Sequence, residues 1–145
     1  LLPALAVALA ADGIGALATY VTPLPPFSLA AARAAIDHCF AAATIPELFA
    51  RLAAEDSAWA RDTLADLRRA SPAALFWTLR LLAEGEDRTL PQCQAAEFAL
   101  SHTTMRHPDF VEGVRAMVVD KDRAPRWSPP LVEDVSEVEI GALFA

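Results

Sequence analysis

Apolar residues recur at intervals of three, four and seven positions along almost the whole chain, and this spacing constrains the fold more than any other feature. It places the apolar side chains on one face of successive α-helices. Val118 and Val119 form a β-branched patch of only two residues, and no alternation typical of a strand appears. We therefore expect an all-α fold, a compact bundle of seven to nine short helices. Because the connections are short, neighbouring helices should pack antiparallel or crosswise.

The same spacing predicts which side chains are buried. One short helix is expected to bury Ile45, Leu48, Phe49 and Leu52. The next apolar helix should direct one face inward, formed by Leu75, Phe76, Leu79 and Leu82. A later helix should bury Phe110, Val111, Val114, Met117 and Val118.

Capping residues predict where the helices begin. A serine or threonine accepts a hydrogen bond from the backbone of the first turn, and a Glu or Gln three residues later completes a capping box. Proline is favoured at the first helical position. The expected starts are Thr44 with Glu47, Asp56, Ser71 with Pro72, Thr89 with Gln92, His107 with Pro108, and Ser136 with Glu139.

Three regions follow from the distribution of proline and of apolar residues. Residues 1–22 should form one or two helices broken near Asp12-Gly13, which we expect to pack against a part of a larger protein. Residues 23–27 form a proline-rich joint, because proline disfavours helix at its own position and the one before. Residues 28–145 should form a helical domain. The opening apolar run has eleven residues, whereas a membrane span needs about 20, so we expect no membrane partner.

Composition excludes several classes of partner. The 145 residues carry a formal net charge of −7, which argues against a nucleic acid or anionic membrane, since both need a basic face. The two cysteines, Cys39 and Cys93, are too few and too distant for a disulfide framework or a metal site. They favour a reducing, cytoplasmic setting.

No arrangement of side chains predicts catalysis. Ser71 is explained by helix capping, and Glu112 is better explained by pairing with Arg115 three positions later than by general-base catalysis. His102 and His107 are five apart, which does not suit a metal site. We therefore predict no catalytic residue and no metal ligand.

One compact basic segment stands out in the C-terminal half. Lys121, Arg123 and Arg126 alternate with Asp120 and Asp122, so charge alone makes the loop unexceptional. Lysine and arginine hold phosphate groups where a phosphate-bearing ligand is expected. The neighbouring Trp127 is expected to anchor the loop by packing.

Residues 107–127 read HPDFVEGVRAMVVDKDRAPRW and resemble the C-terminal signature of the 3-hydroxyisobutyryl-CoA hydrolase branch of the crotonase superfamily. Residues 71–98, reading SPAALFWTLRLLAEGEDRTLPQCQAAEF, also look like that branch, and the resemblance covers roughly residues 25 to 130. The Glu112-Gly113 pair is shared more widely with enoyl-CoA hydratases and isomerases, whereas the VDKD and PRW elements favour the hydrolases.

This resemblance implies a fold and a function. The chain would be the C-terminal helical part of an acyl-CoA thioester hydrolase of valine breakdown, lacking the N-terminal crotonase core that carries the oxyanion hole and catalytic carboxylates. Lys121 and Arg123 would approach the CoA phosphates, CoA entering as part of the substrate and no separate cofactor being needed. The partners would be the acyl-CoA, the missing core and, through an apolar surface left exposed, another copy of the chain. The alternatives are a fragment of an enoyl-CoA hydratase or isomerase, and a non-catalytic helical interaction domain.

Overall fold

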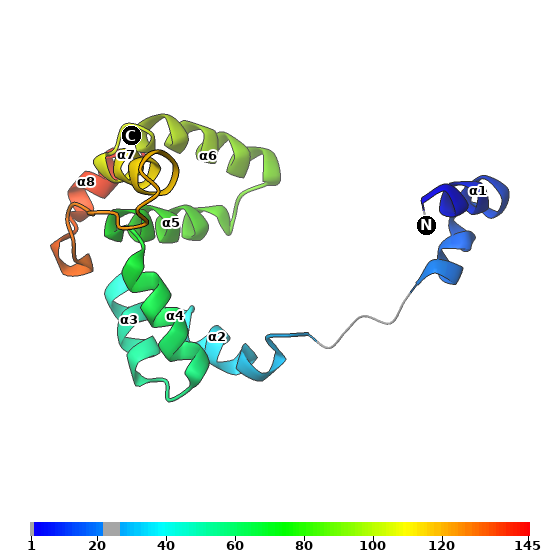
Figure 1. Ribbon diagram of the computed structural model, residues 1–145, viewed down its shortest axis with the longest axis horizontal. Coiled ribbons are helices and arrows are strands. Elements are labelled where there is room, and N and C mark those ends of the chain that lie inside the picture. The colour runs from blue at the N-terminus through cyan, green and yellow to red at the C-terminus, as the bar shows by residue number, and fades with distance from the viewer. Residues whose placement is uncertain (1, 22–26) are drawn as a thin grey trace. The chain divides into compact units, whose positions relative to one another are not determined.

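The computed structural model describes residues 2–21 and 27–145, and the chain divides into two units, residues 1–31 and 32–145. No strand occurs among the described residues, which form eight α-helices together with 3₁₀ segments and one π segment (Figure 1). The predicted all-α class and helix number are confirmed. The predicted joint 23–27 falls mainly on residues 22–26, which lie outside the described residues.

The first unit contains α1 (Leu2–Asp12), followed by a 3₁₀ helix (Gly13–Tyr20). Gly13 has φ 62°, a left-handed conformation that glycine adopts without the cost a side chain would add, and the 3₁₀ helix packs against α1 after this turn. The predicted break near Asp12-Gly13 is thus confirmed. α1 has no buried residue, and Ala16 is buried in the 3₁₀ helix.

The helical run in this unit is longer than its apolar opening suggests. Leu2–Tyr20 spans 19 residues and, by length and composition alone, is apolar enough to cross a membrane. The argument from an eleven-residue run therefore does not hold. Signal sequences and the core helices of soluble proteins share these properties, so the absence of a membrane partner stays a prediction.

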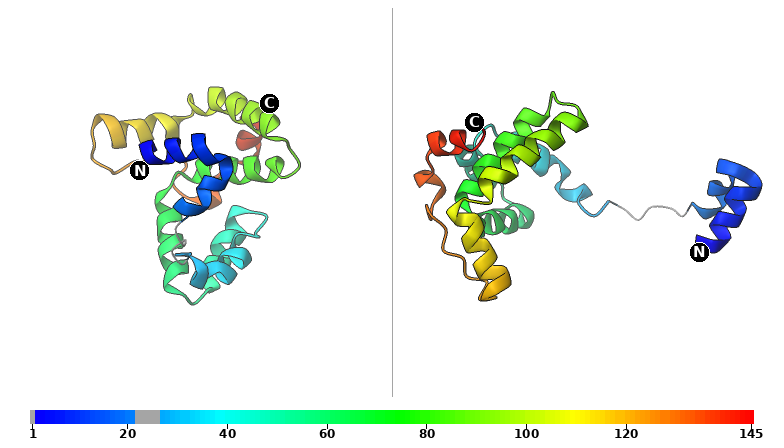
Figure 2. Two further views of the ribbon diagram at one scale, coloured as in Figure 1. Left: turned by 90° about the vertical axis from the view of Figure 1, so that its right-hand side faces the viewer. Right: turned by 90° about the horizontal axis from the view of Figure 1, so that it is seen from above.

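The remaining chain is a succession of short helices. A 3₁₀ turn (Ala30–Ala32) precedes α2 (Arg33–Cys39), α3 (Ile45–Ala54) and α4 (Ala58–Arg69). Next come α5 (Pro72–Gly85), α6 (Leu90–Thr104) and α7 (Pro108–Val114), which continues into a π turn (Arg115–Val119). A loop, a 3₁₀ turn (Val132–Asp134) and α8 (Glu137–Ala142) complete it. Figure 2 shows this unit from two further sides, and α3 packs on α4 while α5 packs on α6 and α8.

The caps form where the sequence places them, with one correction. The side chains of Thr44, Ser71 and Ser136 accept hydrogen bonds from the first turns of α3, α5 and α8. Thr89 and Gln92 form the full capping box of α6. The cap of α4 is Ser57 and not Asp56, since Ser57 Oγ accepts from the Ala60 N–H at 3.2 Å. Asp56 pairs instead with Arg61.

The main core lies between α3 and α4 and confirms the predicted face of α3. Ile45, Leu48 and Leu52 are buried, and Phe49 packs against them half-buried. The other buried members are Cys39, Ala42, Ala60, Leu64 and Val132. Val132 comes from the far C-terminal turn, so the end of the chain closes a core begun by α2.

The apolar face predicted for residues 110–118 is not buried. Phe110 is 44% exposed, Val111 59%, Met117 58% and Val118 63%. The residues buried in α7 and its π turn are instead Asp109 and Ala116. Leu82 of α5 is likewise 68% exposed, which corrects its predicted burial. An apolar stripe identifies a face suited to contact, but not what contacts it.

Candidate functional site

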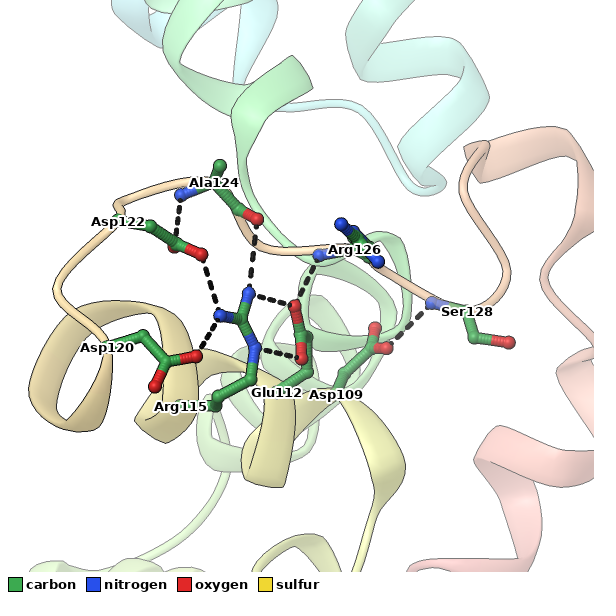
Figure 3. A network of polar contacts seen from close by, with 8 residues as sticks. All are labelled: Asp109, Glu112, Arg115, Asp120, Asp122, Ala124, Arg126 and Ser128. Carbon is green, nitrogen blue, oxygen red and sulfur yellow. Dashed lines mark hydrogen bonds and ion pairs between the residues drawn. The ribbon is translucent and has the colours of Figure 1, made fainter.

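Arg115 organises the loop that follows α7 (Figure 3). Its guanidinium pairs with both carboxylate oxygens of Glu112 at 2.8 Å, and it also reaches Asp120 at 2.6 Å and Asp122 at 2.7 Å. It donates a further hydrogen bond to the Ala124 carbonyl at 3.3 Å. One arginine thus holds three carboxylates and the loop backbone together. Its planar, five-donor head is suited to this in a way that lysine is not.

Glu112 serves this network as an acceptor. Besides Arg115, the Arg126 backbone N–H donates to it at 2.7 Å. These hydrogen bonds, chiefly those from Arg115, lower the pKa of Glu112 to about 2. Arg115 also lowers the pKa of Asp122, while its own pKa is raised by Glu112 and the two aspartates. A carboxylate held so firmly in its ionised form is a poor general base near neutral pH, which supports the structural interpretation of Glu112.

We expect stability to fall in acid through Glu112. Its pKa is about 2 in the folded chain, below the ordinary 4.5, so its ionised form stabilises the fold above about pH 4.5. That contribution is lost progressively as the pH falls towards about 2. Glu112→Gln should therefore lower the melting temperature at pH 7 and flatten its fall in acid, as measured by circular dichroism. The matched control is Glu86→Gln at an exposed loop position. Parallel pH profiles for wild type and Glu112→Gln would contradict the prediction.

A second polar cluster is buried at the start of α7. Asp109 is 3% exposed, and its carboxylate accepts hydrogen bonds from the Ser71 hydroxyl and from the Ser128 backbone N–H, the latter at 2.8 Å. Its own N–H donates to Nδ1 of His107 at 3.2 Å. Asp109 therefore joins the start of α5, the start of α7 and the C-terminal loop.

Trp127 anchors the loop, as its sequence position predicts. Its indole N–H donates to the Arg69 carbonyl at 2.9 Å, which ties the loop to the end of α4. Its ring lies over Gly113, where an added Cβ would come within 3.5 Å of the ring. The two residues of the Glu-Gly pair thus have different roles. Glu112 accepts a hydrogen bond from the loop backbone, and Gly113, which has no side chain, leaves room for the Trp127 ring beside the helix.

Of the two predicted ligand residues, Lys121 and Arg123, only Arg123 lines the groove beside the end of α4. Both are exposed and have left-handed φ values, 56° and 55°, which are uncommon for residues other than glycine. Arg123 lines this groove, of about 490 Å³, together with Arg68, Arg69, Met117, Pro125 and Trp127. Lys121 is not among the residues lining it. No sequence pattern groups Arg68 and Arg69 with Arg123, because helix α4 is distant from the loop along the chain.

No set of three or more His, Cys, Asp or Glu side chains that could hold a metal ion occurs among residues 2–21 and 27–145. His102 makes an edge-to-face contact with Phe98, with ring centroids 4.7 Å apart, and His107 makes one with Trp77 at 5.1 Å. Both histidines are therefore engaged in packing.

Comparison with known proteins extends the similarity beyond the signature segment. Residues 7–144 match the model of the enoyl-CoA hydratase/isomerase family, so the match covers nearly all of the chain and includes the second half of α1. The chain is a member of the enoyl-CoA hydratase/isomerase family.

Within this family it is similar to 3-hydroxyisobutyryl-CoA hydrolases. It is 38% identical over 109 residues to the mitochondrial enzyme of Homo sapiens, covering 75% of this chain and 28% of that protein. With the Xenopus laevis enzyme it shares 35% identity over 126 residues, 87% of this chain and 33% of the relative. The chain thus spans about a third or less of these relatives' length, and it matches their C-terminal part.

Solved structures of the family share the fold. A carnitinyl-CoA dehydratase from Mycobacterium thermoresistibile superposes with a TM-score of 0.86 at 30% identity, over 99% of this chain and 42% of that one. An enoyl-CoA hydratase from Rhodobacter sphaeroides 2.4.1 gives a TM-score of 0.82 at 34% identity, with the same coverage.

Proposed function

We propose that this chain is the C-terminal helical part of a CoA thioester hydrolase that acts on 3-hydroxyisobutyryl-CoA in valine breakdown. The single observation that carries the proposal is the similarity to 3-hydroxyisobutyryl-CoA hydrolases, 38% identity over 109 residues for the human protein. The alternative is a hydratase or dehydratase of the same family, which the names of the two solved relatives favour. The reducing environment suited to two free cysteines supports a cytoplasmic location, although the curated relatives are named as mitochondrial.

In this proposal the chemistry belongs to a core outside this chain. A thioester hydrolase needs backbone donors that stabilise the oxyanion and a carboxylate that activates the attack. The Glu112 carboxylate is hydrogen-bonded to Arg115, and the buried Asp109 carboxylate is hydrogen-bonded to Ser71. Neither carboxylate is therefore available to activate the attack on a thioester. The helices would instead cover the core, and the exposed apolar side chains of α7 and of α1 supply surface for that contact.

Lys121 and Arg123 are proposed to approach the phosphates of CoA. The support is geometric: both side chains are exposed, whereas the intervening Asp122 and the preceding Asp120 pair with Arg115. No separate cofactor is required.

The test is the activity of these residues alone and within the polypeptide their gene encodes. The 145-residue chain should release no thiol from 3-hydroxyisobutyryl-CoA, whereas the gene product, with any residues that precede Leu1, should. Thiol release is followed with a disulfide reagent, and hydration of an enoyl-CoA by loss of its ultraviolet absorbance. Hydration without hydrolysis would favour the alternative. Hydrolysis by the chain alone would contradict the proposal that the catalytic groups lie elsewhere.

A further inference from the structure

We infer that the groove between the end of α4 and the loop after α7 is a phosphate-binding site formed by Arg68, Arg69 and Arg123. Its ligand class is a small molecule with a phosphomonoester or diphosphate group on an apolar or aromatic body. The inference rests on the proposed function only where it names CoA as that molecule.

The groove is lined by positive charge. Three guanidinium-bearing residues line one groove in a protein whose net charge is −7, and no acidic residue lines it. Arg68 and Arg123 take part in no ion pair between the residues that the structure describes. Arg69 pairs with Asp66, but both side chains are more than two-thirds exposed, and such a pair is weak enough to exchange for a phosphate.

The fold separates the acidic from the basic side chains of the loop. In the sequence, acidic and basic residues alternate from Asp120 to Arg123 and would cancel. In the structure both aspartates pair with Arg115, at 2.6 and 2.7 Å (Figure 3). Arg123 lines the groove instead. Both aspartates are thus paired with Arg115 and not with Arg123, whose guanidinium is left without an acidic partner among the residues that the structure describes.

The walls of the groove are fixed before any ligand arrives. The Trp127 indole holds the Arg69 carbonyl, and the Arg123 N–H donates to the Ala116 carbonyl at 3.1 Å. Arg115 donates a hydrogen bond to the Ala124 carbonyl, and the Ala124 N–H donates one to the Asp122 carboxylate. Arg123 is kept in a left-handed conformation by these contacts, a conformation that costs free energy and persists only where the surroundings impose it. Preorganisation of this kind reduces the entropy lost on binding.

The other lining residues indicate the body of the ligand. Met117, Pro125 and Trp127 give the groove an apolar side next to the arginines. Its volume of about 490 Å³ lies in the range of small-molecule sites. Arginine can donate two parallel N–H hydrogen bonds to phosphate oxygens. A nucleotide-like molecule would therefore contact the arginines through its phosphates and the apolar side through its base, whereas an uncharged molecule would leave the arginines unpaired.

Calorimetric titration of the chain with ADP, CoA, inorganic diphosphate and adenosine tests the inference. ADP and diphosphate should bind and adenosine should not. Arg68→Ala, Arg69→Ala and Arg123→Ala should each weaken ADP binding about tenfold, the scale of one hydrogen-bonded charge. Arg106→Ala, which replaces an exposed arginine that does not line the groove, should change it less than about twofold. Thermal melts show that each variant is folded, and because Arg68 is exposed its replacement should leave the fold intact.

Each result decides a separate point. Failure of ADP and diphosphate to bind, or an equal loss in Arg106→Ala, overturns the groove. Binding of CoA that is insensitive to Arg68 and Arg69 also overturns it and leaves the proposed function standing. Binding of ADP and diphosphate without CoA supports the groove and counts against the CoA function.

Discussion

Replacing Leu52 with alanine is expected to destabilise the second unit by about 3 kcal/mol, the scale of large-to-small substitutions in well-packed cores. Leu52 is 1% exposed and lies in the cluster that α3, α4 and the turn at Val132 form together. Truncation removes buried methyl groups and leaves a cavity that the short helices around it can close only in part. Urea unfolding followed by circular dichroism measures the change in the free energy of unfolding.

Two substitutions serve as controls for Leu52→Ala. Leu52→Met keeps the volume of the side chain and should cost less than about 1.5 kcal/mol. Leu82→Ala makes the same chemical change at a position that is 68% exposed on α5, and it should stay within about 0.5 kcal/mol of wild type. A similar loss for Leu52→Ala and Leu82→Ala would show that the α3–α4 cluster is not the core of the unit.

Asp109→Ala is expected to cost about 3 kcal/mol, because it leaves the Ser71 hydroxyl and the Ser128 N–H without an acceptor in a buried place. The carboxylate also lies in the first turn of α7, where the helix dipole favours a negative charge. The melting temperature should fall by roughly 10 °C. Since Asp109 joins α5, α7 and the loop, hydrogen exchange should speed up at Ser128.

The pair with Ser71 is separable from the rest of the Asp109 cluster. Asp109→Asn keeps the shape and one acceptor and should lose less than Asp109→Ala. Ser71→Ala removes both the hydrogen bond to Asp109 and the cap of α5, in which the Ala74 N–H donates at 3.1 Å. In a double-mutant cycle the two alanine substitutions should be coupled by more than about 0.5 kcal/mol. Strictly additive losses would contradict a direct bond between Ser71 and Asp109.

Local chemistry explains which features were predictable. Caps and pairs within one turn depend on residues three or four apart, so Thr89 with Gln92 and Glu112 with Arg115 could be predicted before the fold. The same reasoning erred by one position at Asp56, because either Asp56 or Ser57 can cap α4. Ser71 was explained as a cap, which is correct but incomplete. Its second bond reaches Asp109, which the sequence places far away.

The basic loop shows how far the sequence determined the candidate site. It supplied the phosphate hypothesis through the resemblance and named Lys121 and Arg123, both of which are exposed. It could not show that the aspartates between them turn to Arg115, or that Arg68 and Arg69 line the same groove as Arg123. The direction in which a side chain points depends on the path of the backbone. In this loop that path includes two residues with left-handed φ values, Lys121 and Arg123.

By itself the sequence determined the helical class, most helix starts and the family, because periodicity, capping and signature motifs act over a few residues each. The tertiary structure alone decided that Asp109 is buried, that the apolar residues 110–118 are largely exposed, and that three arginines converge. These depend on which distant segments meet, and such meetings are set by the packing of whole helices rather than by any local pattern.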